Sequence, residues 1–150
     1  MQKLHFLFCA SILFFLVSAV NTTAQAQSKQ VKVSEKGSYG EYLTDGDGMS
    51  LYLFLRDAAG QSTCYNECAE EWASLTVNDT GVPAGQWVNP DMLGTVKRKD
   101  GSLQVTYNGH PLYYYEDDKK AGDITGQDKK EFGAEWYLVK PSGVKMGDVD

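Results

Sequence analysis

The strongest constraint on the fold is the stretch of residues 93–118, in which two turn signals separate three β-prone runs. The turn signals are Asp100-Gly101 and Asn108-Gly109, dipeptides that supply the positive φ angles of tight hairpin turns. The runs between them are rich in Val, Thr and Tyr, which favour strands. The stretch therefore predicts a three-stranded antiparallel meander.

The end of this stretch repeats an earlier segment at a constant spacing. The matching residues are Gly48, Leu51, Tyr52, Phe54 and Asp57 in the first copy and Gly109, Leu112, Tyr113, Tyr115 and Asp118 in the second, with a looser match between Trp72 and Trp136. Both copies contain a Tyr-x-aromatic-x-x-Asp motif on the second strand of a predicted hairpin. Because side chains alternate along a strand, we expect the Tyr and the aromatic residue of each motif to share a buried face, with the Asp capping a turn. The sequence thus assigns structural roles to Tyr52, Phe54, Asp57, Tyr113, Tyr115 and Asp118.

Hydrophobic alternation and chain breakers outline the remaining elements. We expect strands at residues 41–44, 50–57 and 134–139, a short helix within residues 64–75, and loops at residues 76–89 and 119–132. The predicted fold class is mainly β, a small antiparallel β domain of two hairpin-based repeats with one short helix. The repeat units are expected at about residues 39–75 and 94–139.

The first 26 residues predict a cleaved signal peptide. Lys3 precedes an apolar run, residues 4–20, and Ala24-Gln25-Ala26 is a small-x-small cleavage site. The alternative is an uncleaved membrane anchor, because the run approaches the length of a bilayer span. The cleavage site favours removal, and hence no stable membrane span. Cys9 follows Phe8 inside the run rather than a small residue at its end, so no lipid anchor is predicted.

After the signal peptide we expect a polar leader at residues 27–38, one β domain at residues 39–143 and a flexible tail at residues 144–150. The leader contains two valines that alternate around Lys32, so a short first strand is the alternative. The chain has 14 Lys plus Arg against 20 Asp plus Glu, a net charge of −6. A surface of this sign repels phosphate backbones, so nucleic acid is not an expected partner.

Cys64 and Cys68 remain after cleavage and lie one helical turn apart. That spacing brings their Cα atoms to about 6 Å, a separation that a disulfide tolerates, and exported proteins meet oxidising conditions. The alternative is a copper site formed by both cysteines and His110, because thiolates with an imidazole suit Cu(I). Such a set resembles the copper site of copper chaperones with a thioredoxin-like fold, but the β meander is not a thioredoxin pattern. We therefore expect a disulfide and no cofactor.

Aromatic residues outside the repeated face are candidates for ligand binding. Tyr65, Trp87 and Tyr114 lie at a helix start, in a loop and on the strand face that the repeats do not share, so these three are the candidates for exposed binding residues. Trp87 is the one large aromatic residue of the loop at residues 76–89, and the alternative role expected for it is to anchor that loop to the core. Exposed Tyr and Trp stack on sugars or anchor protein interfaces. The sequence shows no Ser-His-Asp order and no Gly-rich phosphate loop, so no enzyme is predicted.

Together these motifs resemble a bacterial family, the secreted repeat of unknown function, also described as a predicted lipoprotein with a conserved Yx(FWY)xxD motif. The resemblance rests on the two repeated motifs, on Cys64-x-x-x-Cys68-Ala69-x-x-Trp72 and on the stretch from Arg98 to Tyr113. It covers about residues 39–143 and implies an exported β-rich domain without an established activity. The chain departs from the family by lacking a convincing lipid-accepting cysteine and by carrying Ala73-Ser74-Leu75 where members often have prolines.

We therefore expect a bacterial protein secreted to the periplasm or the extracellular space, with a non-enzymatic binding or structural role. The expected partner is an envelope protein or a glycan. Two alternatives stay open. One is copper handling or redox chemistry at Cys64, Cys68 and His110, and the other is a carbohydrate-binding surface.

Overall fold

The structure is a computed structural model that describes residues 29–147. The predicted signal peptide, residues 1–26, lies outside the described residues together with its cleavage site and Cys9. Residues 148–150 of the predicted tail lie outside them as well. Within residues 29–147, no helix is long and apolar enough to cross a membrane.

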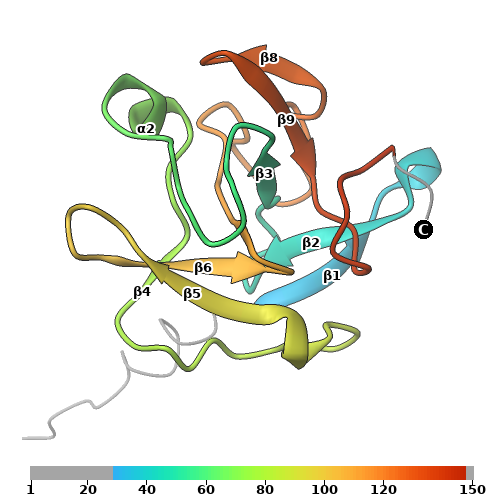
Figure 1. Cartoon of the computed structure of the whole chain (residues 1–150). Helices are drawn as coiled ribbons and strands as arrows, with labels where there is room; N and C mark the ends of the chain where they lie inside the picture. The colour runs from blue at the N-terminus through green and yellow to red at the C-terminus, as the bar shows by residue number, and fades with distance from the viewer. Residues whose placement is uncertain (1–28, 148–150) are drawn as a thin grey trace, which may run out of the picture.

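The described part of the chain forms three small antiparallel sheets, shown in Figure 1. The first sheet pairs β1 (Val31–Glu35) with β2 (Glu41–Asp45). The second sheet has the order β3 (Tyr52–Phe54), β9 (Ala134–Leu138) and β8 (Lys129–Glu131). The third sheet has the order β4 (Thr76–Val77), β6 (Leu103–Tyr107) and β5 (Leu93–Lys97), with β7 (His110–Pro111) also paired to β6. The helical segments are α2 (Glu67–Glu71) and two 3-10 turns, η1 (Gly37–Tyr39) and η2 (Pro90–Met92). The predicted fold class, mainly β with one short helix, is confirmed.

Strands β5, β6 and β7 form the predicted meander. Asn108 and Gly109 connect β6 to β7 with φ angles of 49° and 81°, the two positive values that a type I′ hairpin turn needs. The third strand is short because the chain leaves this sheet after Pro111 and crosses to the first repeat. There, Tyr113 and Tyr52 exchange two backbone hydrogen bonds of 2.9 and 3.0 Å.

Each motif strand pairs with the tryptophan-bearing segment of the other repeat. In β3, Phe54 lies opposite Trp136 of β9. In the second repeat, Tyr113 pairs with Ser74, which follows Trp72 in the chain. The two repeats therefore face each other in a reciprocal arrangement, with the Tyr52–Tyr113 pair at its centre.

The core contains one aromatic and one mostly aliphatic cluster. In the aromatic cluster, Phe54 stacks on Trp136 at 4.0 Å between ring centroids, Trp136 on Trp72 at 3.9 Å, and Trp72 on Tyr115 at 4.3 Å. Each motif aromatic residue thus stacks on the tryptophan of the other repeat. The main aliphatic members of the second cluster are Val31, Leu43, Leu51, Leu53, Leu75, Val105, Leu112 and Val139. Neither repeat can complete the aromatic cluster alone.

The predicted boundary between leader and domain is wrong, because residues 31–35 form β1. Val31 is fully buried, and its N–H donates to the carbonyl of Pro83 at 3.1 Å. Val33 packs against the aliphatic cluster. Two alternating valines were too short a signal to outweigh the polar composition, whereas in the fold the partner strand β2 supplies the burial.

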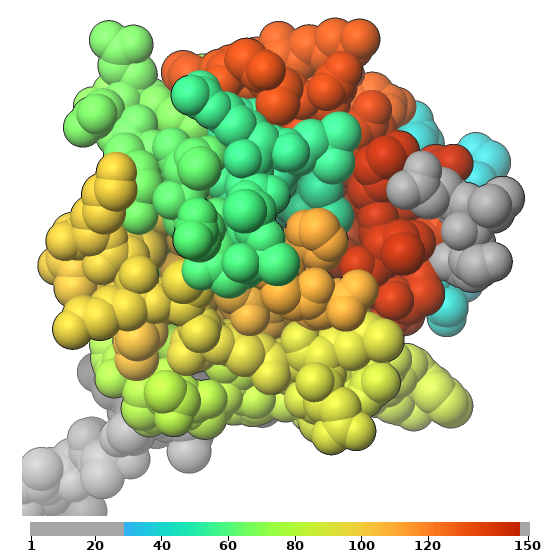
Figure 2. Space-filling model, viewed as in Figure 1, coloured from blue at the N-terminus to red at the C-terminus, as the bar shows by residue number. Residues whose placement is uncertain are grey.

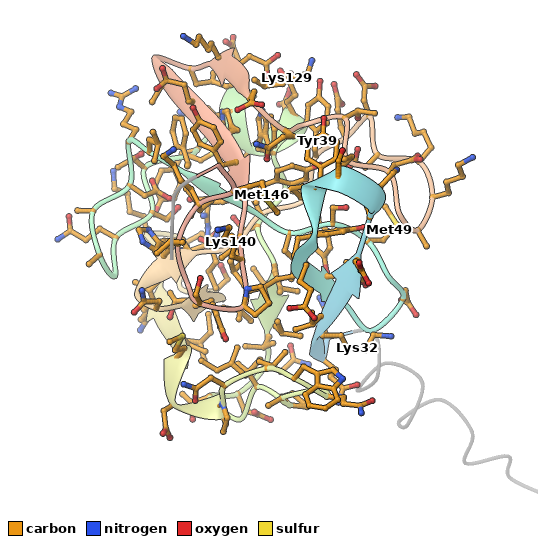
Figure 3. All side chains as sticks on the ribbon, turned by 90° about the vertical axis from the view of Figure 1, so that its right-hand side faces the viewer. Lys32, Tyr39, Met49, Lys129, Lys140 and Met146 are labelled. Atoms are coloured by element: carbon orange, nitrogen blue, oxygen red, sulfur yellow. A yellow bond between two sulfur atoms is a disulfide. The ribbon has the colours of Figure 1, made fainter. Side chains whose placement is uncertain are left out.

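The predicted tail also begins too early, because residues 144–147 fold back onto β9. The N–H of Lys140 donates to the carbonyl of Val144 at 2.9 Å, and the N–H of Met146 donates to that of Leu138 at 2.8 Å. Gly143, with φ at 83°, permits this turn. Met146, labelled in Figure 3, is 6% exposed and belongs to the aromatic cluster.

The predicted helix is shorter than its spacing indicates, and α2 ends before Trp72. The carbonyl of Ala73 accepts a hydrogen bond from the N–H of Tyr114 at 2.8 Å, and the N–H of Leu75 donates to the carbonyl of Leu112 at 3.0 Å. Backbone pairing between the repeats therefore overrides the local helical pattern. Within the second repeat, hairpin pairing with β9 likewise makes residues 129–131 a strand, β8, inside the predicted loop at residues 119–132.

Candidate functional site

The tyrosine of each repeated motif donates a hydrogen bond to the aspartate of the other motif. Tyr52 Oη donates to Asp118 Oδ2 at 2.7 Å, and Tyr113 Oη donates to Asp57 Oδ2 at 2.5 Å. We call these the cross-repeat pairs. The repeat revealed both residue types from the sequence, but nothing in their spacing indicated that the partner lies in the other copy.

The second carboxylate oxygen of each aspartate caps the turn that follows it. Asp57 Oδ1 accepts bonds from the backbone N–H and the hydroxyl of Thr63, both at 2.7 Å. Asp118 Oδ1 accepts the corresponding bonds from Thr125 at 2.8 and 2.6 Å. Each aspartate therefore joins a local turn to the opposite repeat.

Burial decides the protonation of the cross-repeat pairs. Desolvation, reinforced by the facing aspartate, raises the pKa of Tyr52 and of Tyr113 far above the ordinary tyrosine value. Both hydroxyls consequently stay protonated and act as donors. Burial also raises the pKa of Asp57, against the opposing hydrogen bonds from Tyr113 and Thr63.

Cys64 and Cys68 form the predicted disulfide, with an S–S distance of 2.01 Å and a Cα–Cα distance of 5.2 Å. The buried guanidinium of Arg98 supports the start of this loop by donating to the carbonyl of Cys64 at 2.8 Å. Arg98 also lies 4.4 Å from the ring centroid of Tyr65. The buried guanidinium of Arg98 thus holds the backbone at the start of the disulfide loop.

The copper alternative requires Cys64, Cys68 and His110 to lie together. His110 is in β7, opposite Tyr107, and both sulfur atoms are in the disulfide. Among residues 29–147, no group of three His, Cys, Asp or Glu side chains is arranged to hold a metal ion. The structure therefore does not assemble this ligand set.

The three aromatic residues named as candidates for exposed binding lie in different surroundings. Trp87 is 75% exposed, so the expectation that it anchors its loop to the core is wrong. Tyr65 is half-buried against Arg98, and Tyr114 is half-buried with its hydroxyl donating to Asp45 Oδ2 at 2.9 Å. Tyr114 is therefore not an exposed binding residue, because its hydroxyl is held by Asp45 at the end of β2. The structure does not bring the three rings into one surface.

An open pocket of about 620 Å³ lies between the end of β3, the disulfide loop and the turn from β8 to β9. Its apolar lining residues include Phe54, Tyr65, Cys68 and Phe132. Figure 2 shows the green surface of residues 55–68 next to the orange surface of the β8–β9 turn. We call this the Arg56 pocket, after the exposed cation at its rim.

Arg56 is not held by a carboxylate. Its guanidinium donates to the carbonyl of Phe132 at 3.1 Å, and within residues 29–147 it has no acidic partner at 4.0 Å or less. The equivalent position of the second repeat is Asp117, so the repeated fold does not require a cation there. An unpaired guanidinium in an acidic protein can bind an anion.

Phe132 is also not explained by the local backbone. Phe132 and Gly133 join β8 to β9 with φ angles of 54° and 90°, a type I′ turn like that of Asn108 and Gly109. Asn-Gly is the preferred pair in such a turn, and a bulky residue at positive φ costs about 1 to 3 kcal/mol. The turn therefore holds an aromatic ring at a strained position, where the ring packs against the aromatic cluster and lines the pocket.

Sequence reasoning missed both Arg56 and Phe132. They are 76 positions apart, and the pairing of β3 with β9 brings them together. The sequence signal that could have identified Arg56 is the alignment of the two repeats, in which Arg56 and Asp117 occupy equivalent positions.

Comparison with known proteins identifies the family of this chain. The family model described as a secreted repeat of unknown function matches residues 33–76 and 94–140. No curated protein and no solved structure matches the chain. The two matched segments make up more than half of the chain and contain both copies of the motif, which confirms the resemblance found in the sequence. The chain belongs to the family of the secreted repeat of unknown function.

Proposed function

We propose that the protein is an exported, non-enzymatic binding module of the cell envelope, with the Arg56 pocket as its ligand site. The observation that carries the proposal is the unpaired guanidinium of Arg56 beside the strained aromatic turn residue Phe132. The repeated fold does not require a cation at Arg56, the turn at Phe132 does not favour a bulky residue, and both residues line the same pocket, where Phe132 also packs against the aromatic cluster. Residues kept against local preference are enriched at functional sites.

The ligand group that fits Arg56 is an anion attached to an apolar body. The guanidinium supplies planar donors that suit a carboxylate, and the ring of Phe132 supplies an apolar surface. Two groups that could attack a ligand are already engaged, because Thr63 donates its hydroxyl to Asp57 and Cys68 is in the disulfide. The hydroxyl of Tyr65 accepts a hydrogen bond from the N–H of Lys99 at 3.3 Å. This lining favours holding a ligand over attacking one.

The pocket is built on segments that are already fixed before a ligand arrives. Phe54 stacks on Trp136, the disulfide closes the loop of Cys64 and Cys68, and the hairpin turn sets Phe132. A preorganised site loses less conformational entropy on binding. A disulfide-closed site also suits the oxidising conditions outside the cytoplasm, in the periplasm or beyond the cell.

The test is a titration of isotope-labelled secreted protein with benzoate and cyclohexanecarboxylate, two small carboxylates that carry a ring. We expect concentration-dependent amide shifts at Thr63, Phe132 and Gly133. Arg56→Gln should remove these shifts because it removes the cation. Lys120→Gln is the matched control, since it removes one exposed positive charge outside the pocket lining.

Phe132→Asn is the second test variant, because it gives the turn the residue found at Asn108. We expect this variant to remain folded, since Asn relieves the positive φ angle, and to lose most of the shifts at Gly133. Shifts that persist unchanged in both variants, or that appear only around Trp87, would contradict the proposed site.

A further inference from the structure

We infer that the ligand of the Arg56 pocket is an acidic sugar, a saccharide unit that carries a carboxylate. This inference rests on the proposed function and names the chemical class that the pocket selects. It is carried by three features of the lining: one cation, one anion and aromatic apolar surface.

The opposite charges of Arg56 and Glu67 restrict the ligand. Both side chains are exposed and line the pocket, and no ion pair joins them. An ionised glutamate only accepts hydrogen bonds, so it needs donors from the ligand. Inorganic phosphate or sulfate would bring further negative charge to Glu67 and few donors. A sugar acid satisfies both sides, with its carboxylate on Arg56 and its hydroxyls donating to Glu67.

The remaining polar lining also suits hydroxyl groups. Asn66 is exposed beside Glu67, and its amide both donates and accepts. Adjacent ring hydroxyls have the same dual capacity, so the pair formed by Asn66 and Glu67 can bind two of them. A simple apolar carboxylate would leave these groups facing only water.

The apolar lining distinguishes a sugar from a peptide. The aromatic lining residues are Phe54, Tyr65 and Phe132, of which Tyr65 and Phe132 are half-buried and Phe54 is 2% exposed. Aromatic rings carry a negative face that attracts the polarised C–H groups of a sugar ring. The Leu or Val side chain of a peptide ligand binds best in a deep pocket lined by aliphatic residues, whereas this pocket is open to solvent. The same openness leaves room for a polysaccharide chain to extend beyond the bound sugar.

The experiment compares two trisaccharides that differ in their acid groups. Wild-type secreted protein is titrated calorimetrically with trigalacturonate and with galactotriose, its neutral counterpart. We expect trigalacturonate to bind about ten- to a hundredfold more tightly, the effect of one charge-assisted bond. Arg56→Gln should reduce the affinities to the same weak level, and Lys120→Gln should leave the difference intact. Glu67→Gln should weaken both sugars, because it weakens the acceptor for their hydroxyls.

The outcomes separate this inference from the proposed function. If trialanine, whose C-terminus is a carboxylate, binds through Arg56 more tightly than trigalacturonate, the sugar class is overturned while the pocket remains a binding site. The same holds if benzoate and trigalacturonate bind equally. If no carboxylate probe shows affinity that depends on Arg56, both proposals fail.

Discussion

Removal of the Asp118 carboxylate tests whether the cross-repeat pairs hold the two repeats together. The side chain is 6% exposed and accepts three hydrogen bonds, from the hydroxyl of Tyr52 and from the N–H and hydroxyl of Thr125. Asp118→Ala leaves these donors without their acceptor in a place that water reaches poorly. A bond to a charged group contributes about 1.5 to 3 kcal/mol, and such losses are not additive. We expect the variant to lose about 4 kcal/mol of unfolding free energy.

Asp100→Ala is the matched control for this substitution. Asp100 Oδ1 accepts the same two local bonds, from the N–H and hydroxyl of Ser102, but the side chain is exposed, and its other oxygen lies 4.0 Å from Nε of Arg98 instead of accepting from a tyrosine. A turn cap alone would make the two variants similar. The structure instead predicts a much smaller loss for Asp100→Ala, because water replaces its bonds.

Urea unfolding followed by tryptophan fluorescence measures both losses, since Trp72 and Trp136 lie in the aromatic cluster. A double-mutant cycle then locates the interaction. We expect a coupling energy of about 1 to 2 kcal/mol between Tyr52→Phe and Asp118→Ala. We expect almost no coupling between Tyr52→Phe and Asp57→Ala, although Tyr52 and Asp57 belong to the same motif. Equal losses for the Asp100 and Asp118 variants, or coupling within a motif, would refute the reciprocal arrangement.

Three further predictions concern separate parts of the chain. Cys64 and Cys68 should resist alkylation in folded protein and yield two thiols only after reduction in denaturant, while replacing both by Ser should cost about 2 kcal/mol or less, because the ring is small; a thiol that reacts without reduction would contradict the disulfide. Trp136→Ala should cost about 3 to 5 kcal/mol as a buried stacking residue, whereas Trp87→Ala, at a 75% exposed side chain, should change stability by less than about 0.5 kcal/mol, both read from urea midpoints. Burial raises the pKa of Asp57 above 3.8, so the folded protein holds the Asp57 proton more tightly than the unfolded chain does. The stability that this protonation contributes is complete below pH 3.8 and is lost as the pH rises through the raised pKa. Urea midpoints of the wild type measured upward from pH 3.8 should therefore fall with pH, Asp57→Asn should remove this decrease, and an unchanged decrease in the variant would contradict the assignment to Asp57.

Features that depend on near neighbours were predictable. Asn108-Gly109 specified a type I′ turn because both central residues need positive φ, and the spacing of Cys64 and Cys68 allowed a disulfide. The two motif copies indicated a duplicated β unit. These signals are readable because the physics behind them acts over a few residues, through backbone sterics and the pitch of a helical turn.

Boundaries failed where burial came from a distant partner. Residues 31–35 read as a polar leader, and only β2 and the carbonyl of Pro83 make them a strand. Residues 144–147 read as a tail, and only the aromatic cluster buries Met146. In both places the local composition was polar or glycine-rich, so the free energy of ordering comes from the surrounding fold.

Local sequence was enough to predict a duplicated β domain with a disulfide, because strand alternation, turn dipeptides and cysteine spacing are local properties. Only the fold shows that the tyrosine of each motif copy bonds the aspartate of the other copy. Tyr52 bonds Asp118 at a separation of 66 residues and Arg56 meets Phe132 at a separation of 76. Such contacts follow from the pairing of β3 with β9 and of Tyr52 with Tyr113. The pairing of distant strands is set by the total burial of the aromatic cluster. Each segment contributes only part of that burial, so no single segment of sequence predicts the pairing.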